Sequence, residues 1–226
     1  MVLKAKAAKV LALMVLTFAA ATSVQAFENP VLIAEQGSFA AGGTVVRSDG
    51  SFNYRVPSDQ SGQSLHGDHA YVFYQKPAKT HKYPLVFLHG AGQSAKTWET
   101  TPDGRDGFQN IFLGKGYSTY LIDQPRRGRA GQSTAAENIS AATYDQLWFS
   151  NFRLGNWPDF FEGVQFSKNQ EALNQFFRQM TPNTGAFDEN IISAAVAAVF
   201  DKSGPGILVT HSQGGRSGLA GSYKKS

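Results

Sequence analysis

The fold is decided by the stretch Ile207-Leu208-Val209-Thr210-His211-Ser212-Gln213-Gly214-Gly215. A short apolar run of β type stops there at a serine that has glycines close behind it. Such a serine can occupy a sharp turn between a strand and a helix, where small neighbours relieve crowding. We therefore predict a buried strand over 207–210 and a nucleophile elbow at Ser212, although Thr210 stands where a glycine is usual. An ordinary serine is a poor nucleophile, so it also needs a base and a group that orients the base.

A second motif follows another apolar run, Leu85-Val86-Phe87-Leu88, which is typical of a strand buried on both faces of a parallel sheet. It ends in His89-Gly90-Ala91-Gly92. Glycines let the backbone come close to a substrate, so the N–H of Ala91 or Gly92 can stabilise an oxyanion together with the N–H of Gln213. A plain tight turn is the alternative. Each motif lies at a strand end and in the expected order, which favours a catalytic site.

Neither neighbouring histidine is the expected base. We predict that His89 is a structural hydrogen-bonding residue of its loop. His211 adjoins Ser212 on the elbow, where neighbouring side chains project in different directions, so its imidazole should not reach Ser212 Oγ productively. The pair His66-x-x-His69 has no further ligand at a diagnostic spacing, and we expect both to be loop residues and no metal site.

The remaining pattern indicates an α/β fold, a mostly parallel sheet with helices on both faces. Strands are expected over 31–39, 44–47, 70–75 and 117–122, with a turn at 48–50 and helices at 108–115 and 188–202, the second capped by Asp188. The segment from about 134 to 187 has few β-type runs and many aromatic residues. We predict that it is a helical cap inserted over the sheet, with most aromatic side chains in its own core and the rest facing a pocket.

The N-terminus predicts export. Residues 1–26 have three lysines, an apolar stretch too short to span a bilayer, and the small-x-small site Val24-Gln25-Ala26, which are the features of a signal peptide cleaved after Ala26. We expect a periplasmic or secreted protein of residues 27–226, one domain, with no stable membrane association afterwards.

Composition excludes several classes of function. Three of the 21 basic residues and none of the 17 acidic ones lie in the signal segment, so the mature chain has a net charge of +1. Arg126-Arg127-x-Arg129 is a short basic cluster within another motif, and nothing favours nucleic-acid binding. The chain has no cysteine, which excludes disulfides, a thiol nucleophile and a Cys-based metal site.

Taken together, the chain resembles the α/β-hydrolases, and more narrowly secreted bacterial serine esterases with a helical cap. The resemblance extends from Gly37 onward. Four stretches carry it, and the second and third are the most specific: Leu88-His89-Gly90-Ala91-Gly92-Gln93-Ser94, Trp98-Glu99-Thr100-Thr101-Pro102-Asp103-Gly104-Arg105-Asp106-Gly107, Asp123-Gln124-Pro125-Arg126-Arg127-Gly128-Arg129-Ala130 and Thr210-His211-Ser212-Gln213-Gly214-Gly215.

The resemblance implies that Ser212 is the nucleophile and that Ala91 and Gln213 frame the oxyanion hole. It also implies a structural role for Asp123 and a rigid loop at Asp103-Gly104-Arg105, with Arg105 paired to a carboxylate. The substrate is expected to be a small ester with an apolar part. No cofactor is expected, and the number of subunits is left open.

The sequence departs from the pattern after the nucleophile. Hydrolases of this kind place an acid and a histidine later in the chain, and residues 213–226 contain neither. We therefore expect a truncated version of a longer esterase, poorly stable alone and with little activity. A non-catalytic relic that binds small apolar ligands, and a lactone or amide hydrolase on the same fold, are the alternatives.

Overall fold

The structure is a computed structural model that describes residues 30–137 and 139–223, the last three without side chains. The predicted signal peptide of residues 1–26 lies outside the described residues. Residues 31–226 form one unit, which is described below.

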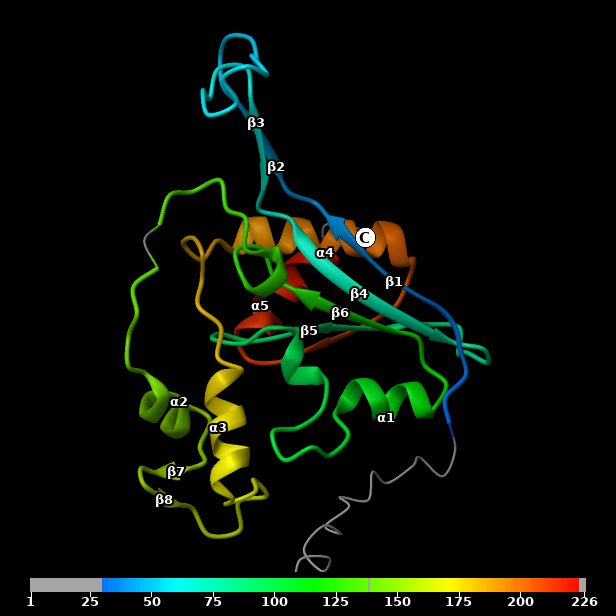
Figure 1. Ribbon diagram of the computed structural model, residues 1–226. Helices are drawn as coiled ribbons and strands as arrows, with labels where there is room; N and C mark the ends of the chain where they lie inside the picture. Colours follow the sequence, from blue (N-terminus) through cyan, green and yellow to red (C-terminus); the bar gives the residue numbers. More distant parts are fainter. Residues whose placement is uncertain (1–29, 138, 224–226) are drawn as a thin grey trace, which may run out of the picture. The chain divides into compact units, whose positions relative to one another are not determined.

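The centre of the unit is a five-stranded sheet with the strand order β1-β4-β6-β5-β9 (Figure 1). Its strands are β1 (Ile33–Ala41), β4 (Ala70–Pro77), β6 (Thr119–Asp123), β5 (Leu85–Leu88) and β9 (Ile207–Thr210). Strands β6, β5 and β9 are parallel, while β4 and β1 add antiparallel pairs at one side. The predicted strands are confirmed, with ends that differ by a few residues. The prediction that 207–210 is buried is wrong, because β9 lies at the edge of the sheet and is only partly covered.

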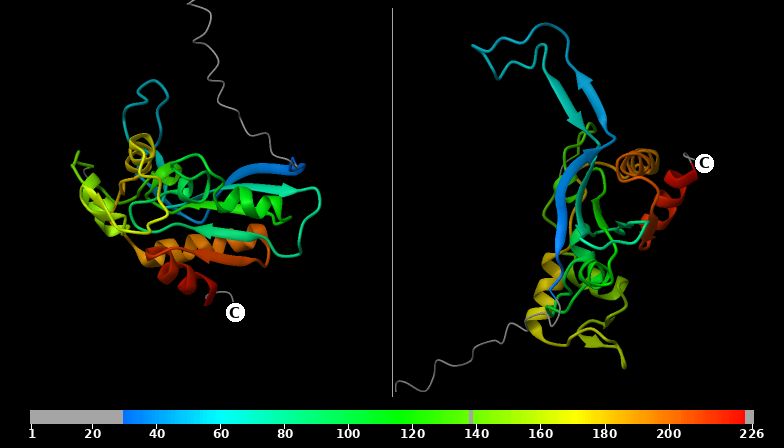
Figure 2. Two further views of the ribbon diagram at one scale, coloured as in Figure 1. Left: turned by 90° about the horizontal axis from the view of Figure 1, so that it is seen from below. Right: turned by 90° about the vertical axis from the view of Figure 1, so that its right-hand side faces the viewer.

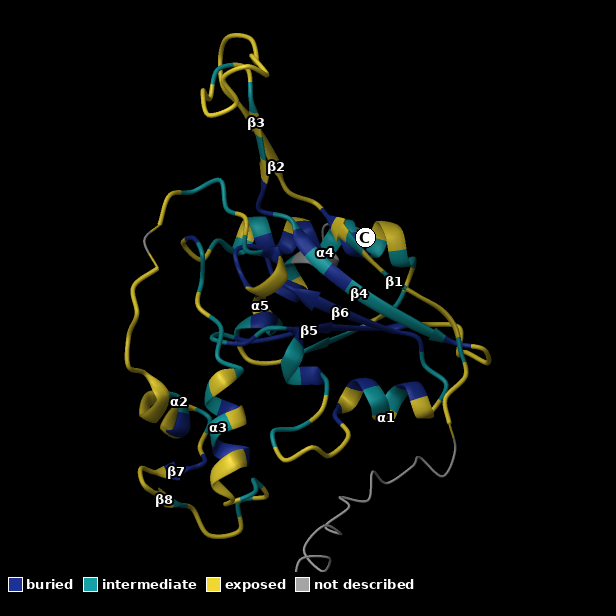
Figure 3. Cartoon of the chain, viewed as in Figure 1, coloured by how far each residue is buried: buried dark blue, intermediate teal, exposed yellow. Residues whose placement is uncertain are grey.

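Helices cover both faces of the sheet, as the sequence predicts (Figure 2). Helix α4 (Glu189–Ser203) packs through Ile192 and Val196 onto Val86 and Leu88. Residues at the alternate positions, such as Phe87, face the 3₁₀ helix η1 (Ala95–Trp98) and helix α1 (Phe108–Gly114). Because successive side chains of a strand point to opposite faces, a strand covered on both sides must be apolar throughout, and β5 and β6 are fully buried (Figure 3).

Helix α4 begins where the sequence predicts. The carboxylate of Asp188 accepts hydrogen bonds from the N–H groups of Asn190, at 2.9 Å, and Ile191, at 3.1 Å. These bonds satisfy N–H groups that have no partner inside the helix. After β9, helix α5 (Gln213–Tyr223) returns along the same side as α4 (Figure 2).

A two-stranded hairpin, β2 (Thr44–Arg47) and β3 (Ser64–Gly67), extends away from the sheet (Figure 1). Strand β3 was not predicted, because Ser64-Leu65-His66-Gly67 has no apolar alternation. The chain bends at Asp49 and Gly50 into a loop that reaches to Gln63, so 48–50 is not a tight hairpin turn. His66 lies in β3 opposite Val45, and the prediction that it is a loop residue is wrong.

The segment 134–187 contains two helices, α2 (Asp145–Asn151) and α3 (Gln170–Arg178), and a small hairpin, β7 (Gly155–Asn156) and β8 (Asp159–Phe160). A hydrophobic cluster holds them together. Its buried members are Phe149, Leu154, Leu173 and Phe176. The hairpin was not predicted. Most of the aromatic side chains belong to this cluster, whereas Trp157 and Phe161 are exposed.

Candidate active site

Ser212 lies at the junction of β9 and α5 in a left-handed backbone conformation, with φ of 51°. Few residues other than glycine adopt this conformation, and it accompanies functional sites when the surrounding structure enforces it. Two glycines allow the elbow and the loop 89–92 to approach each other closely. A Cβ atom added to Gly214 would lie 2.5 Å from the His89 carbonyl oxygen, and one added to Gly90 would lie 3.0 Å from Ser212 Cβ. The strained turn at Ser212 is therefore packed directly against the glycine-rich loop His89-Gly90-Ala91-Gly92.

A pocket of about 500 Å³ opens at this turn. The residues that line it come from the glycine-rich loop, the elbow and the C-terminal end of α2: Ala91, Trp148, Asn151, Phe152, Arg153, His211 and Ser212. Ser212 and Ala91, two of the three residues predicted for catalysis, thus share one pocket. The α2 residues were expected only as unspecified aromatic side chains of the cap. Trp148 and Phe152 make part of the wall apolar.

His211 is engaged elsewhere. Its Nδ1 lies 2.9 Å from Gln93 Oε1, and its ring stacks on Phe152 with 6.0 Å between centroids. An amide oxygen only accepts, so Nδ1 carries the proton in this bond. Gln93 Oε1 also accepts the N–H of Gly90 at 3.0 Å, and this side chain therefore joins the elbow to the glycine-rich loop. The sequence did not single out Gln93.

His89 is fully buried beneath the same loop. Its Nδ1–H donates to the Gly90 carbonyl oxygen at 3.0 Å, and its Nε2 accepts the N–H of Gln124 at 3.1 Å. The Gln124 side-chain amide also donates to the His89 carbonyl oxygen. Burial lowers the pKa of His89 to about 4, so the ring is neutral near pH 7. These contacts confirm that His89 is a structural residue of the loop.

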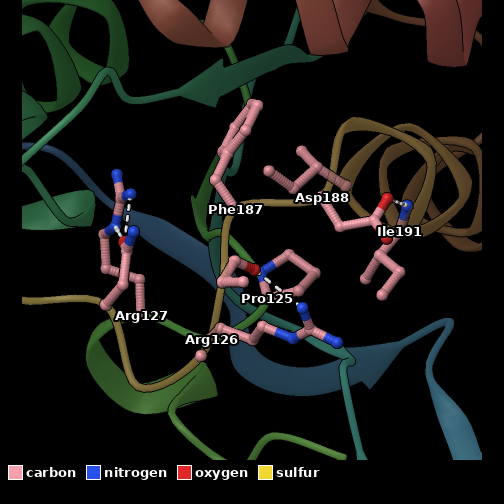
Figure 4. A pocket seen from close by; sticks show the side chains of 10 residues that line it. Pro125, Arg126, Arg127, Phe187, Asp188 and Ile191 are labelled. Carbon is pink, nitrogen blue, oxygen red and sulfur yellow. Dashed lines mark hydrogen bonds between the residues drawn. The ribbon is translucent and has the colours of Figure 1, made fainter. Parts of the chain in front are cut away.

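The three arginines of the 126–129 motif have separate environments. Arg126 makes a bidentate ion pair with Asp68 at 2.7 and 3.0 Å, and Arg129 Nε donates to Asp123 Oδ2 at 2.9 Å. Arg127 forms no ion pair within the described part of the chain, although only 3% of it is exposed. Its side chain and that of Arg126 point in different directions, and a small cavity of about 10 Å³ adjoins both (Figure 4).

Asp68 and Arg126 together hold both ends of the segment 134–187. Asp68 accepts the N–H of Thr134 at 3.2 Å and also the Thr134 hydroxyl. Arg126 Nη1 donates to the carbonyl oxygen of Ala186 at 2.7 Å. Helix α2, which lines the pocket, lies within the segment that this pair anchors at both ends. Sequence reasoning missed the pair, since the partners are 58 residues apart.

The structural role expected for Asp123 and the ion pair expected for Arg105 are both confirmed. Asp123 Oδ1 accepts the N–H of Ala95 at 2.6 Å while Oδ2 accepts from Arg129, so the carboxylate ties two loops together. Arg105 pairs with Asp103 at 2.9 Å and reaches the carbonyl oxygen of Gln165 at 3.5 Å.

Within the described residues, no group of three or more His, Cys, Asp or Glu side chains is placed to hold a metal ion. In the same residues, no helix has the length and apolar character needed to cross a membrane.

Comparison with known proteins agrees with this architecture. A solved bacterial esterase superposes with a TM-score of 0.73 and 31% identity, over 87% of this chain and 66% of its own length. A fungal protein named a probable secreted lipase, phiG of Fungal sp. (strain ATCC 74256), is 33% identical over 150 residues, 62% of this chain and 40% of its own length. The chain thus spans less than two thirds of either relative.

No established family profile matches the chain. The superposition on the bacterial esterase, the strand order and the elbow at Ser212 nevertheless agree with one another. The chain has the α/β-hydrolase fold.

Proposed function

We propose that this chain is a serine hydrolase of carboxylic esters in which Ser212 is the nucleophile. The observation that carries the proposal is the left-handed backbone of Ser212 at the strand-to-helix turn, on the wall of a 500 Å³ pocket that Ala91 shares. A strained turn that exposes a serine above the ends of parallel strands is the geometry of acyl transfer on this fold. The names of both relatives, an esterase and a lipase, support the same reaction class.

In the proposed reaction Ser212 Oγ attacks the ester carbonyl carbon, and the carbonyl oxygen takes up the negative charge. The N–H groups of Ala91 and Gln213 stabilise this oxyanion. Collapse of the intermediate expels the alcohol, which takes up the proton that a base has removed from Ser212, and leaves an acyl-enzyme. Water then hydrolyses the acyl-enzyme to the acid and restores the Ser212 hydroxyl.

The first step also requires a base for the Ser212 proton. Among residues 30–137 and 139–223, no histidine or carboxylate is hydrogen-bonded to Ser212 Oγ. His211 Nδ1 is occupied by Gln93.

The pocket supports an ester with an apolar part as substrate. Trp148 and Phe152 offer aromatic surface, while Asn151 and Arg153 add polar groups at the end of α2. We also propose that the protein is exported, with the signal peptide cleaved after Ala26. The name of the fungal relative, a probable secreted lipase, is consistent with export.

The test is hydrolysis of p-nitrophenyl acetate and butyrate by residues 27–226 and by any longer reading frame that contains them. Each is compared with its Ser212→Ala variant. Turnover that disappears with Ser212→Ala supports the proposal. Turnover that persists in the variant, or a folded longer protein that binds these esters without cleaving them, contradicts it. The same comparison tests the expectation that residues 27–226 alone have little activity.

A further inference from the structure

We propose that Arg127 is a positioning residue that orients and polarises the peptide bond between Gly90 and Ala91, so that the Ala91 N–H faces the oxyanion. This inference rests on the proposed function, since it concerns one of the two donors assigned there. The evidence is the set of groups that the buried guanidinium contacts.

Arg127 binds the carbonyl side of that peptide. Its Nη1 donates to the Gly90 carbonyl oxygen at 2.8 Å, and the same oxygen accepts Nδ1–H of His89 at 3.0 Å. A trans peptide is planar, and its C=O and N–H point in opposite directions. Two donors that fix the Gly90 carbonyl therefore also fix the direction of the Ala91 N–H, and Ala91 is one of the residues that line the pocket.

This peptide needs such an anchor because glycine precedes it. Glycine at position 90 leaves room that a side chain would take up, since an added Cβ would lie 3.0 Å from both Ser212 Cβ and His211 Nδ1. Glycine permits more backbone conformations than other residues, so the following peptide unit can rotate more easily. A rotated peptide would present its carbonyl oxygen, in place of the N–H, to the developing negative charge.

The positive charge of Arg127 polarises the Gly90–Ala91 peptide bond in addition to orienting it. The other arginines of the motif have carboxylate partners, Asp68 and Asp123, whereas the contacts of Arg127 in the described residues are neutral oxygens. Its Nε donates to Asn183 Oδ1 at 2.8 Å, and Nη1 lies 3.5 Å from Gln213 Oε1. A cation at the carbonyl end of a peptide makes its N–H a stronger donor, because hydrogen bonds in series polarise one another.

Burial of an unpaired guanidinium is costly, and burial lowers the pKa of Arg127 to about 10, which leaves the side chain protonated near pH 7. For stability alone, an apolar side chain or a paired arginine would serve better. Arg127 also contacts the side chain of Gln213, whose N–H is the second proposed donor. The unpaired charge thus lies next to both donors of the oxyanion.

The sequence offers a direct way to observe this peptide. Only two glycine-alanine pairs occur in it, Gly90-Ala91 and Gly185-Ala186. With ¹³C at glycine carbonyls and ¹⁵N at alanine amides, an HNCO spectrum of the chain therefore contains two peaks. The Gly185-Ala186 peak is an internal reference, because Arg127 donates no hydrogen bond to that peptide.

The variants are Arg127→Met, Arg127→Lys and, as the matched control from the same motif, Arg129→Met. We expect Arg127→Met to move the Gly90 ¹³C and Ala91 ¹⁵N resonances upfield. Arg127→Lys, which keeps the charge, should restore most of the shift, while Arg129→Met should leave the peak in place. In parallel, Arg127→Met should lower kcat about 30-fold with KM changed less than about 3-fold, less than the full loss of one oxyanion donor. Arg127→Lys should recover kcat to within about 5-fold of the wild type.

The proposal is overturned if Arg127→Met moves the Gly90-Ala91 peak no further than Arg129→Met does. It is also overturned if the peak moves while kcat stays the same, since Arg127 is then only a structural anchor. Turnover that survives Ser212→Ala, or no turnover in the wild type, counts against the proposed function instead, and the spectrum still decides whether Arg127 holds the peptide.

Discussion

The buried pair of Arg126 and Asp68 provides the sharpest test of how the pocket wall is held. The side chain of Arg126 is 9% exposed and that of Asp68 is 1% exposed. Arg126→Met removes the guanidinium but leaves the carboxylate buried with only Thr134 as a partner. Loss of one member of a buried ion pair costs about 3–5 kcal/mol, because the remaining charge has no compensation.

The structure allows part of this magnitude to be checked. The pKa of Asp68 is lowered from 3.8 to about 2, first by the hydrogen bond from Arg126 and then, against the opposing effect of burial, by the bonds from Thr134. A shift of that size corresponds to about 2 kcal/mol. The lost bond from Arg126 to Ala186, at 2.7 Å, adds about 1 kcal/mol. We therefore expect Arg126→Met to lower the free energy of unfolding by about 3 kcal/mol.

Urea unfolding followed by tryptophan fluorescence measures this change. Lys76→Met is the matched control, because Lys76 pairs with Glu35 at 2.9 Å on the surface, and such exposed pairs are worth less than about 1 kcal/mol. The double variant Arg126→Met/Asp68→Asn should recover part of the loss, since it leaves no unpaired charge. Limited proteolysis of Arg126→Met should also cut first within residues 134–187. A loss below about 1 kcal/mol, similar to that of Lys76→Met, would show that the pair does not clamp this segment.

Four further predictions concern the same region. The folded-state pKa of Asp68 lies below its ordinary value, so its contribution to the free energy of unfolding is fully present above about pH 4 and disappears as the pH falls through about 2. The stability difference between wild type and Asp68→Asn in acid titrations should therefore shrink over that window. A constant difference would refute this prediction. Ser212→Gly should be about 1 kcal/mol more stable than Ser212→Ala in thermal unfolding, because glycine accepts a φ of 51° without strain, and equal stability would argue against strain at the elbow. Gly90→Ala should lower stability by about 1–3 kcal/mol and kcat more than KM, because its Cβ would press on His211 and Ser212, and an unchanged kcat would contradict this packing. Phe152→Ala should shift the preferred p-nitrophenyl ester toward longer acyl chains, since it widens the pocket, and an unchanged preference would place the acyl group elsewhere.

Sequence predicts those parts of the fold that depend on local pattern. The apolar runs 85–88 and 207–210 both form strands, the first buried on both faces and the second at the edge of the sheet, and helix α4 begins at its predicted cap, Asp188. Strand β3 was missed because it pairs only with β2 in an exposed hairpin, where no core selects an alternating pattern. Strands β7 and β8 were missed because each has only two residues, too few to show an alternating pattern.

Within the candidate site, sequence identified the backbone positions, while the side chains that hold them came from the structure. Ser212, Ala91 and Gln213 follow from motifs at strand ends, which local spacing determines. The supporting contacts of Gln93 with His211 and of Asp68 with Arg126 join residues far apart in the chain. No local pattern encodes such pairs, because they depend on the register in which distant segments pack.

The 126–129 motif shows how a local sequence pattern differs from the contacts that the fold supplies. Three arginines within four residues are equivalent by sequence, and a short basic cluster is all that the pattern indicates. Their roles differ because of which oxygen the fold supplies to each: a carboxylate for Arg126 and Arg129, and a peptide carbonyl for Arg127. Only the last arrangement leaves positive charge unneutralised, and it lies at the peptide that joins Gly90 to the pocket residue Ala91. A buried arginine without a carboxylate is thus a signal that the structure alone can provide, and here it leads to the proposed oxyanion site.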